Sequence, residues 1–237
     1  MTTKILGIIT ARGGSKRVPR KNIISILGKP MLAYACDAFK KSELVNRFIL
    51  DTDDTEIAEV GKRYGAEVAY MRPSDLAQDG TAHVPVLKNA LETLKKIDGY
   101  WPDAVVLVQP TSPLIQSKHI DDVLALLLGD PTLDSAETIF EVPNIFHPYN
   151  VRHIDENGFT KFVMAPQRAE FQKTGKRIIA YAVGTVFAFR PDTLWKYGTI
   201  QGEKSKSVII DKKFAVDVDE PLDVVIAEAM MRQLEQS

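Results

Sequence analysis

Ile5-Leu6-Gly7-Ile8-Ile9 is a short, continuous apolar stretch that leads directly into a basic, glycine-bearing loop ending at Asn22. An unbroken apolar run of this length predicts a strand that is buried on both faces of a sheet. Similar runs recur along the chain, and segments with apolar residues at helical spacing separate most of them. This alternation predicts an α/β fold in which helices cover both faces of a mostly parallel sheet.

The individual elements are placed by their patterns. Strands are expected at residues 5–9, 47–50, 67–70, 104–108, 185–189 and 207–210. Helices are expected at residues 31–39, 56–64, 84–97, 117–128 and 221–234. Thr52-Asp53-Asp54 supplies polar side chains that suit the N-cap of the second helix.

The pattern changes after about residue 133. Residues 138–162 are rich in Pro, Asn, His and Phe, with a turn signal at Asp155-Glu156-Asn157-Gly158. Short alternating stretches between such residues predict irregular β structure. The sequence has no internal repeat, low-complexity tract or flexible linker. We therefore expect a single domain over residues 1–237, from which this region projects as an arm.

Composition narrows the class of protein. The chain has 237 residues, a formal net charge of −1, 45% hydrophobic residues and 26% charged residues, which is typical of globular proteins. A nearly neutral chain is not suited to coating nucleic acid or an anionic membrane. No apolar run reaches roughly 18 residues, and the N-terminus has no signal pattern. We expect a cytoplasmic protein with neither nucleic acid nor membrane as a partner.

The single cysteine, Cys36, excludes an internal disulfide and suits a reducing compartment. It ends the apolar stretch Met31-Leu32-Ala33-Tyr34-Ala35-Cys36, so we expect a small core residue and not a nucleophile. Four histidines lack metal-ligand spacing, and we expect structural or surface roles for them. They are His83, His119, His147 and His153.

The loop after the first strand concentrates positive charge. Gly13 and Gly14 have no Cβ and would let backbone N–H groups approach an anion closely. Arg12, Lys16 and Lys21 would neutralise a triphosphate and the charge that builds up as pyrophosphate leaves. The loop matches neither G-x-x-x-x-G-K-[ST] nor G-x-G-x-x-G, the two common phosphate motifs. A solvated basic loop without a ligand remains the alternative.

A second polar segment, Gln109-Pro110-Thr111-Ser112-Pro113, follows the apolar run at 104–108. Ligands of open α/β sheets bind outside the carboxyl ends of the strands. Gln109, Thr111 and Ser112 are therefore placed to hydrogen-bond a polar substrate. The alternative is a proline-braced turn in which Ser112 only caps the next helix.

The third segment, residues 214–221, carries two carboxylates. Residues two apart in a strand face the same side, so Asp217 and Asp219 would present their carboxylates together. Mg²⁺ with oxygen ligands is the usual partner of such a pair in phosphoryl transfer. For Asp219 alone, the alternative is that it caps the helix that begins near Pro221.

Taken together, these segments resemble the acylneuraminate cytidylyltransferase family, the CMP-sialic acid synthetases and their bacterial relatives. The resemblance is carried by residues 11–22 (ARGGSKRVPRKN), 109–113 (QPTSP) and 217–223 (DVDEPLD), with further similarity at 53–58 and 72–79. It runs in order over nearly the whole chain. Lys21-Asn22 resembles the sialic-acid branch rather than the related Kdo-activating enzymes.

The resemblance implies a Rossmann-like α/β sheet and a homodimer in which a protruding arm, residues 138–180 here, reaches the partner's active site. It implies that Arg12, Lys21 and Asp217 act in catalysis, and that Asp217 and Asp219 bind Mg²⁺. The substrate-binding residues that it implies are Ala11, Lys16, Asn22, Arg72, Thr81, Gln109, Ser112 and Tyr181. Of these, Arg72 and Thr81 would line the cytidine pocket, and Gln109 would face the sugar.

The reaction implied by the resemblance joins CMP from CTP to a nonulosonic acid. The anomeric hydroxyl of the sugar would attack the α-phosphorus of CTP in line, and pyrophosphate would leave. Arg12 and Lys21 would offset the developing negative charge. No general base stands out in the sequence, so we expect a metal-assisted or substrate-assisted deprotonation.

The sequence departs from the family pattern on the sugar side. Ile115 stands where relatives carry Arg, and Val183 stands where Asn is expected. A cluster of arm residues has two interpretations, recognition of a sugar carboxylate or simple decoration of the arm. Its members are Arg168, Lys176, Arg177 and Tyr181.

Several functions therefore stay open. In the first, the enzyme activates sialic, legionaminic or pseudaminic acid. In a second, it is a nucleotidyltransferase that uses a different sugar, a sugar phosphate or another nucleotide. The alternative from another class is a catalytically silent nucleotide-sugar-binding protein. The intact pairs Arg12 with Lys21 and Asp217 with Asp219 argue against that silent protein.

Overall fold

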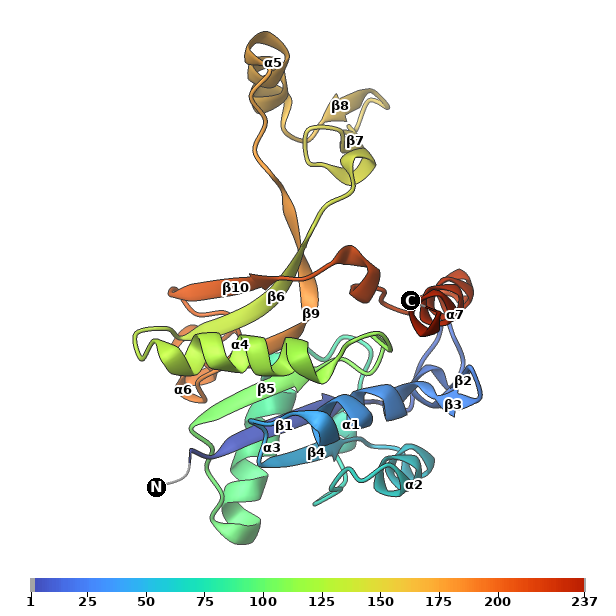
Figure 1. Cartoon of the computed structure of the whole chain (residues 1–237), viewed down its shortest axis with the longest axis vertical. Helices are drawn as coiled ribbons and strands as arrows, with labels where there is room; N and C mark the ends of the chain where they lie inside the picture. The colour runs from blue at the N-terminus through green and yellow to red at the C-terminus, as the bar shows by residue number, and fades with distance from the viewer. Residues whose placement is uncertain (1–2, 237) are drawn as a thin grey trace.

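The computed structural model describes residues 3–236, and its centre is a six-stranded sheet with the order β10-β6-β9-β5-β1-β4 (Figure 1). The strands are β1 (Ile5–Thr10), β4 (Arg47–Asp51), β5 (Ala104–Val108), β6 (Ser135–Glu141), β9 (Tyr181–Phe189) and β10 (Ser205–Ile209). β1 pairs in parallel with β4 and β5, and β6 pairs in parallel with β10. β9 runs antiparallel to both of its neighbours. The predicted α/β fold with a mostly parallel sheet is confirmed.

Helices cover both faces of this sheet. One face carries α1 (Met31–Lys41), α2 (Thr55–Arg63) and α4 (Ser117–Gly129), and the other carries α3 (His83–Asp98) and α6 (Asp192–Tyr197). Successive residues of β1 alternate between the two cores, because side chains of a strand point to opposite faces. Ile9 packs into the first core and Ile8 into the second.

A third, smaller core lies beside the sheet, where α7 (Pro221–Glu235) packs near the short hairpin of β2 (Ser25–Ile26) and β3 (Lys29–Pro30) (Figure 1). Fully buried Ile26, Val218 and Ala227 meet there. Short 3₁₀ turns connect the larger elements. They are η1 (Lys21–Ile23), η2 (Ser74–Leu76), η3 (Asn144–Phe146) and η4 (Lys212–Phe214).

Most of the expected elements are confirmed to within a few residues at each end. Asp54 is the N-cap of α2, and its carboxylate accepts the Ile57 N–H at 3.0 Å. The strand expected at 67–70 is wrong, since only Glu67 forms a bridge, with Ile49 of β4. Further along, the N–H of Arg72 donates to Thr52 O at 2.8 Å, but residues 68–70 form no ladder with β4.

The segment between β6 and β9 projects from the sheet as an arm, coloured yellow to orange in Figure 1. It carries the hairpin β7 (Arg152–Ile154) with β8 (Thr160–Phe162) and the helix α5 (Ala165–Thr174). The expected irregular β structure is confirmed in the hairpin. The sequence did not predict α5, because this helix buries none of its residues and so has no apolar stripe to reveal it.

One smaller expectation is also tested by the structure. Cys36 is fully buried in the first core, and burial raises the pKa of its thiol to about 12, so it is a core residue as predicted. Within residues 3–236, no helix is long and apolar enough to cross a membrane.

Candidate active site

A cleft with a volume of about 700 Å³ opens at the carboxyl ends of β1 and β5. This is the edge at which open α/β sheets bind ligands. Ten of its wall residues belong to the set expected from the sequence. They are Arg12, Lys16, Lys21, Asn22, Arg72, Thr81, Gln109, Thr111, Asp217 and Asp219. The structure thus brings all three chemistry-bearing segments to one place.

The basic loop is held by residues at the end of β4 and just after it. The Ala11 N–H donates to Asp51 O at 3.0 Å, and the Gly13 N–H donates to Asp53 Oδ1 at 3.0 Å. A Cβ on Gly13 would lie 2.7 Å from a carboxylate oxygen of Asp54, so glycine is needed there for packing against α2. Gly14 faces open space, since nothing lies within 4 Å of the place of a Cβ. Of the two glycines, only Gly14 leaves room for an anion.

The cations of the loop are paired with carboxylates. Arg12 Nη1 lies 2.9 Å from Asp79 Oδ1, and Lys16 forms an ion pair with the other oxygen of Asp79. The Lys16 ammonium is the main reason that the pKa of Asp79 lies below its usual value. Lys21 Nζ lies 2.7 Å from Asp219 Oδ1. Asp79 was not predicted as a site residue, because nothing local in the sequence marks it as a partner of this loop.

Asp217 and Asp219 do not lie in a strand, which corrects the expectation for this segment. Val218 between them donates its N–H to Thr111 O at 2.8 Å and is fully buried, whereas both aspartates face the cleft. The side chains of residues 217–219 therefore alternate in direction as predicted, but the segment forms no β-ladder. Its bond to Thr111 joins it to a loop and not to a strand. Desolvation and, to a smaller degree, the charge of Asp219 raise the pKa of Asp217.

The helix-capping alternative for Asp219 is wrong. The N-cap of α7 is Glu220, and its capping partner is Asp223. The carboxylate of Asp219 instead binds Lys21. Asp219 is thus free of a capping role and belongs to the cleft.

Three residues expected at the site do not line the cleft. Ala11 is fully buried in the first core. Ser112 is 1% exposed, and its hydroxyl has no hydrogen-bond partner among the described residues, because the chain turns inward after Thr111. Tyr181 lies at the base of the arm, where it pairs with Glu141 of β6. Gln109 and Thr111 are the members of the second segment that reach the cleft.

The far wall of the cleft holds a buried cation. Arg72 is 7% exposed, and its Nε lies 3.0 Å from Asp51 Oδ1. Beside it, Thr81 and His83 stand at the start of α3. Desolvation and the charge of Arg72 lower the pKa of His83. The sequence reasoning assigned His83 to a structural or surface role, although its position two residues after Thr81 could have indicated the cleft.

The residues that depart from the family pattern lie elsewhere. Ile115 is buried in the first core, and Val183 is 52% exposed on β9, next to the arm. Arg168 holds the arm together, since its guanidinium donates to Tyr149 O at 3.0 Å and to Asn150 Oδ1 at 2.8 Å. None of these three residues lines the cleft.

A basic loop that faces two carboxylates at the strand ends of an α/β sheet defines a nucleotide-handling enzyme of the phosphoryl-transfer type. Residues 6–235 match the family described as Cytidylyltransferase, and the chain belongs to this family. It is therefore a nucleotidyltransferase.

Two relatives and one solved structure illustrate the similarity. The chain is 28% identical to an N-acylneuraminate cytidylyltransferase of Escherichia coli, over 96% of this chain and 52% of that protein. It is 28% identical to a pseudaminic acid cytidylyltransferase of Campylobacter jejuni, over 97% of each. The fold is similar to that of CMP:2-keto-3-deoxy-manno-octonic acid synthetase complexed with CTP, with a TM-score of 0.73 at 19% identity, covering 98% of this chain and 100% of that one. The chain spans about half the length of the first relative and almost all of the second.

Proposed function

We propose that this protein joins CMP from CTP to a sialic-acid-like nonulosonic acid, N-acylneuraminate, legionaminate or pseudaminate, and releases pyrophosphate. One observation carries the proposal: a single cleft brings the cations of the basic loop opposite Asp217 and Asp219. The sugar class is supported by the relatives, which act on N-acylneuraminate and pseudaminic acid.

The basic loop binds the triphosphate in this proposal. Arg12 and Lys16 are exposed enough to leave Asp79 for a phosphate, because surface ion pairs are weak and exchange readily with solvent. Asn22 donates from its side-chain amide to Arg12 O at 2.9 Å and so keeps the loop in shape. As pyrophosphate departs, Arg12 and Lys21 offset the charge on its oxygens.

Asp217 and Asp219 fit a magnesium ion. Both carboxylates face the cleft from either side of buried Val218, and oxygen ligands are those that Mg²⁺ prefers. No cluster of three potential metal-ligating side chains occurs among residues 3–236, so phosphate and water oxygens would complete the coordination. When bound, the ion would supply charge stabilisation at the reacting phosphate.

The remaining residues orient the reactants. Arg72 and Thr81 receive the cytidine, and Gln109 at the end of β5 faces the sugar. The anomeric hydroxyl attacks the α-phosphorus in line with the departing pyrophosphate. The proton of this hydroxyl passes to an oxygen of the bound substrates, since neither Gln109 nor Thr111 is basic enough to take it.

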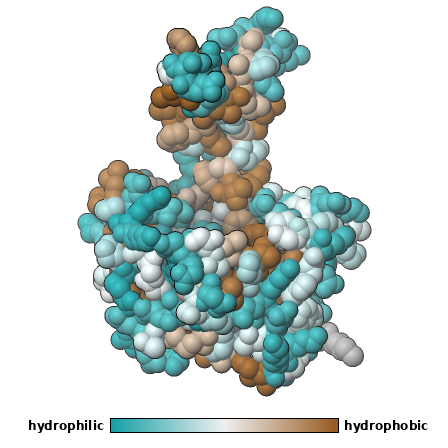
Figure 2. Space-filling view, turned by 180° about the vertical axis from the view of Figure 1, so that it is seen from behind, coloured by the Kyte–Doolittle hydropathy of each residue, from teal (hydrophilic) through white to brown (hydrophobic). Residues whose placement is uncertain are grey.

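We also propose a cytoplasmic homodimer formed through the arm. The arm exposes several large apolar side chains, and Figure 2 shows such surface gathered on the arm and its stalk. They include Ile145, Phe146, Ile154, Ile178 and Ile179, each more than half exposed. Contiguous apolar surface of this kind marks an interface. The buried thiol of Cys36 suits a reducing compartment.

A pyrophosphate-release assay tests the function. CTP and Mg²⁺ are supplied with a panel of nonulosonic acids, with Kdo and with sugar phosphates, and UTP replaces CTP in parallel. Release with one or more nonulosonic acids is expected. Pyrophosphate release with sugar phosphates but with no nonulosonic acid would show that another acceptor is used. If no acceptor in the panel gives pyrophosphate release, a catalytically silent binding protein is favoured.

A further inference from the structure

We propose that Asp51 is a positioning residue for nucleotide recognition: it fixes the guanidinium of Arg72 so that the free N–H groups of Arg72 face the nucleobase. The proposal rests on the assignment of Arg72 to the cytidine pocket made above. Asp51 is the last residue of β4 and does not itself line the cleft.

Two different groups of Asp51 hold the guanidinium. The carboxylate Oδ1 accepts from Arg72 Nε at 3.0 Å, and the main-chain O accepts from Arg72 Nη2 at 2.9 Å. A single contact would leave the planar group free to rotate about it, whereas two contacts on one edge fix both its position and its plane.

The pair is shielded from water. Asp51 is fully buried, and Arg72 is 7% exposed. Burial raises the pKa of the Asp51 carboxyl, and the charge of Arg72 acts in the opposite direction. Oδ2 of Asp51 has no hydrogen-bond partner among the described residues, although the Tyr70 hydroxyl and the charge of Asp53 also act on this carboxylate. Of these groups, Arg72 is the cation that compensates the buried charge. Breaking the pair between Asp51 and Arg72 therefore disturbs the local structure more than breaking a surface ion pair does.

The backbone around Asp51 serves both halves of the cleft. Asp51 O also accepts the N–H of Ala11, where the basic loop begins, and Thr52 O accepts the N–H of Arg72. The phosphate-binding loop and the base-binding arginine are thus both hydrogen-bonded to Asp51, the last residue of β4. Replacing Asp51 by Asn leaves these main-chain bonds in place and removes the charge of the acceptor that holds Arg72 Nε.

The donors left on Arg72 match cytosine. An arginine has five N–H groups, and Nε with one N–H of Nη2 are used by Asp51. Three N–H groups remain, the two of Nη1 and the second of Nη2, on a residue that lines the cleft. Cytosine presents two adjacent acceptors, O2 and N3, whereas uracil presents an N–H at position 3. A guanidinium that cannot turn away would therefore favour CTP over UTP, since an unpaired polar group is costly in a buried site.

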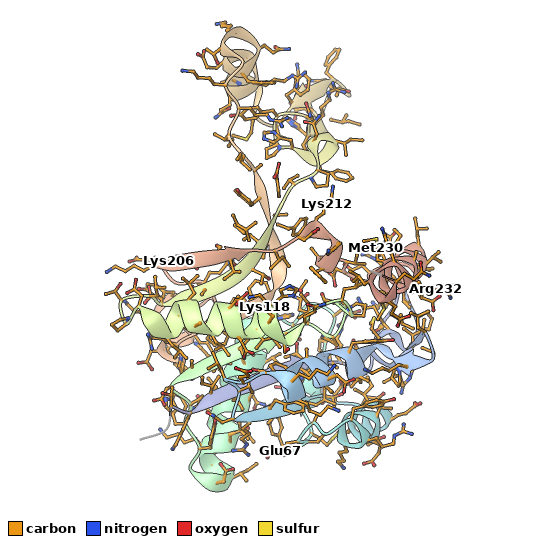
Figure 3. All side chains as sticks on the ribbon, in the orientation of Figure 1. Glu67, Lys118, Lys206, Lys212, Met230 and Arg232 are labelled. Carbon is orange, nitrogen blue, oxygen red and sulfur yellow. The ribbon has the colours of Figure 1, made fainter. Side chains whose placement is uncertain are left out.

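Asp51→Asn is the central test, because it keeps the shape of the side chain and removes its charge. Glu67→Gln is the matched control: Glu67 also pairs with an arginine of β4, Arg47, with contacts of 2.7 and 2.6 Å. That pair lies at the other end of the strand, about 13 Å away along it, and Figure 3 shows Glu67 at the foot of the molecule, opposite the arm.

For Asp51→Asn we expect the KM for CTP to rise about tenfold or more, with kcat and the KM for the sugar within about threefold of the wild-type values. The preference for CTP over UTP should shrink by a similar factor. Inhibition by inorganic tripolyphosphate, which has no base, should stay unchanged. Glu67→Gln should leave all five quantities unchanged. An unaltered KM for CTP in a folded Asp51→Asn protein would overturn the inference, and so would an equal loss of tripolyphosphate binding.

Two further variants separate this inference from the function on which it rests. If Arg72→Met leaves the KM for CTP unchanged, the assignment of Arg72 to the base fails. The double variant Asp51→Asn with Arg72→Met leaves no unpaired buried charge, so it also serves if Asp51→Asn alone does not fold. It should match Arg72→Met in its KM for CTP, because Asp51 acts only through Arg72. A further tenfold weakening in the double variant would contradict that.

Discussion

The Lys21 ammonium nitrogen lies 2.7 Å from Oδ1 of Asp219, although 198 positions separate the two residues in the chain. The contact joins the basic loop to the acidic segment that precedes α7. It also pairs the positive charge of Lys21, which is proposed to hold the triphosphate, with the negative charge of Asp219, which is proposed to hold the metal. Binding of substrate would then exchange this ion pair for one phosphate contact and one metal contact.

Replacing Lys21 tests this exchange. Lys21→Met should lower kcat/KM for CTP about 100-fold, because it removes a preorganised cation from the reacting phosphates. The melting temperature should change little, since Asp219 stays solvated. Lys62→Met, which breaks a surface ion pair with Glu59 on α2, is the control and should leave activity unchanged. Wild-type kinetics in the Lys21 variant would show that Lys21 has no role in the reaction.

The metal assignment is tested at Asp217. Asp217→Asn should reduce kcat about 100-fold and should raise the Mg²⁺ concentration needed for half-maximal rate. Asp122→Asn, which weakens an exposed pair with Lys118 on α4, should alter neither quantity. Full activity of the Asp217 variant at ordinary Mg²⁺ would contradict the assignment.

Asp79 competes with phosphate for the cations of the loop. Asp79→Asn should therefore lower the KM for CTP by about two- to fivefold at low ionic strength, because Arg12 and Lys16 lose their internal partner. The difference should fade in high salt, since exposed charges are screened. Asp75→Asn on η2 is the neighbouring control. If Asp79→Asn instead weakens CTP binding, the carboxylate has a direct role in the bound complex.

The thiol of Cys36 provides a pH-dependent test of the first core. Its pKa is raised to about 12 by burial, so it gains its charge only far above neutral pH. At pH 8 about one thiol in ten thousand would be the reactive thiolate. The native protein should react slowly with Ellman's reagent, and the protein unfolded in guanidinium should react at once. Rapid labelling of the native protein would show that this core opens easily.

The arm is tested through oligomeric state. The double variant Ile178→Asp with Ile179→Asp places two charges on an exposed apolar surface, where they would have to be desolvated in an interface. We expect light scattering to show a monomer in place of a dimer, with an unchanged circular dichroism spectrum. Ile97→Asp, at an equally exposed position near the end of α3, should leave the dimer intact.

Local sequence patterns predicted most of the fold and the chemistry of the cleft. Apolar runs and helical spacing located the sheet and helices, and the i, i+2 spacing of Asp217 and Asp219 predicted their common side. These patterns depend on neighbours in the chain. The pairing of Asp79 with Arg12, the inward turn that buries Ser112 and the bond from Val218 to Thr111 depend on segments far apart in sequence. No local pattern encodes such contacts, and α5 was missed because it packs against too little to need an apolar face.

The reversed direction of β9 has a consequence for how this enzyme class can diversify. Because β9 is antiparallel to β5 and β6, the chain leaves β6 and re-enters β9 at the same edge of the sheet, the edge on which the cleft opens. An insertion at this point lengthens or reshapes what stands beside the cleft without changing the register of the strands. Loop exchange at this point can therefore reshape the surroundings of the cleft, while the ends of β1, β4 and β5, which hold the basic loop and Gln109, stay in place.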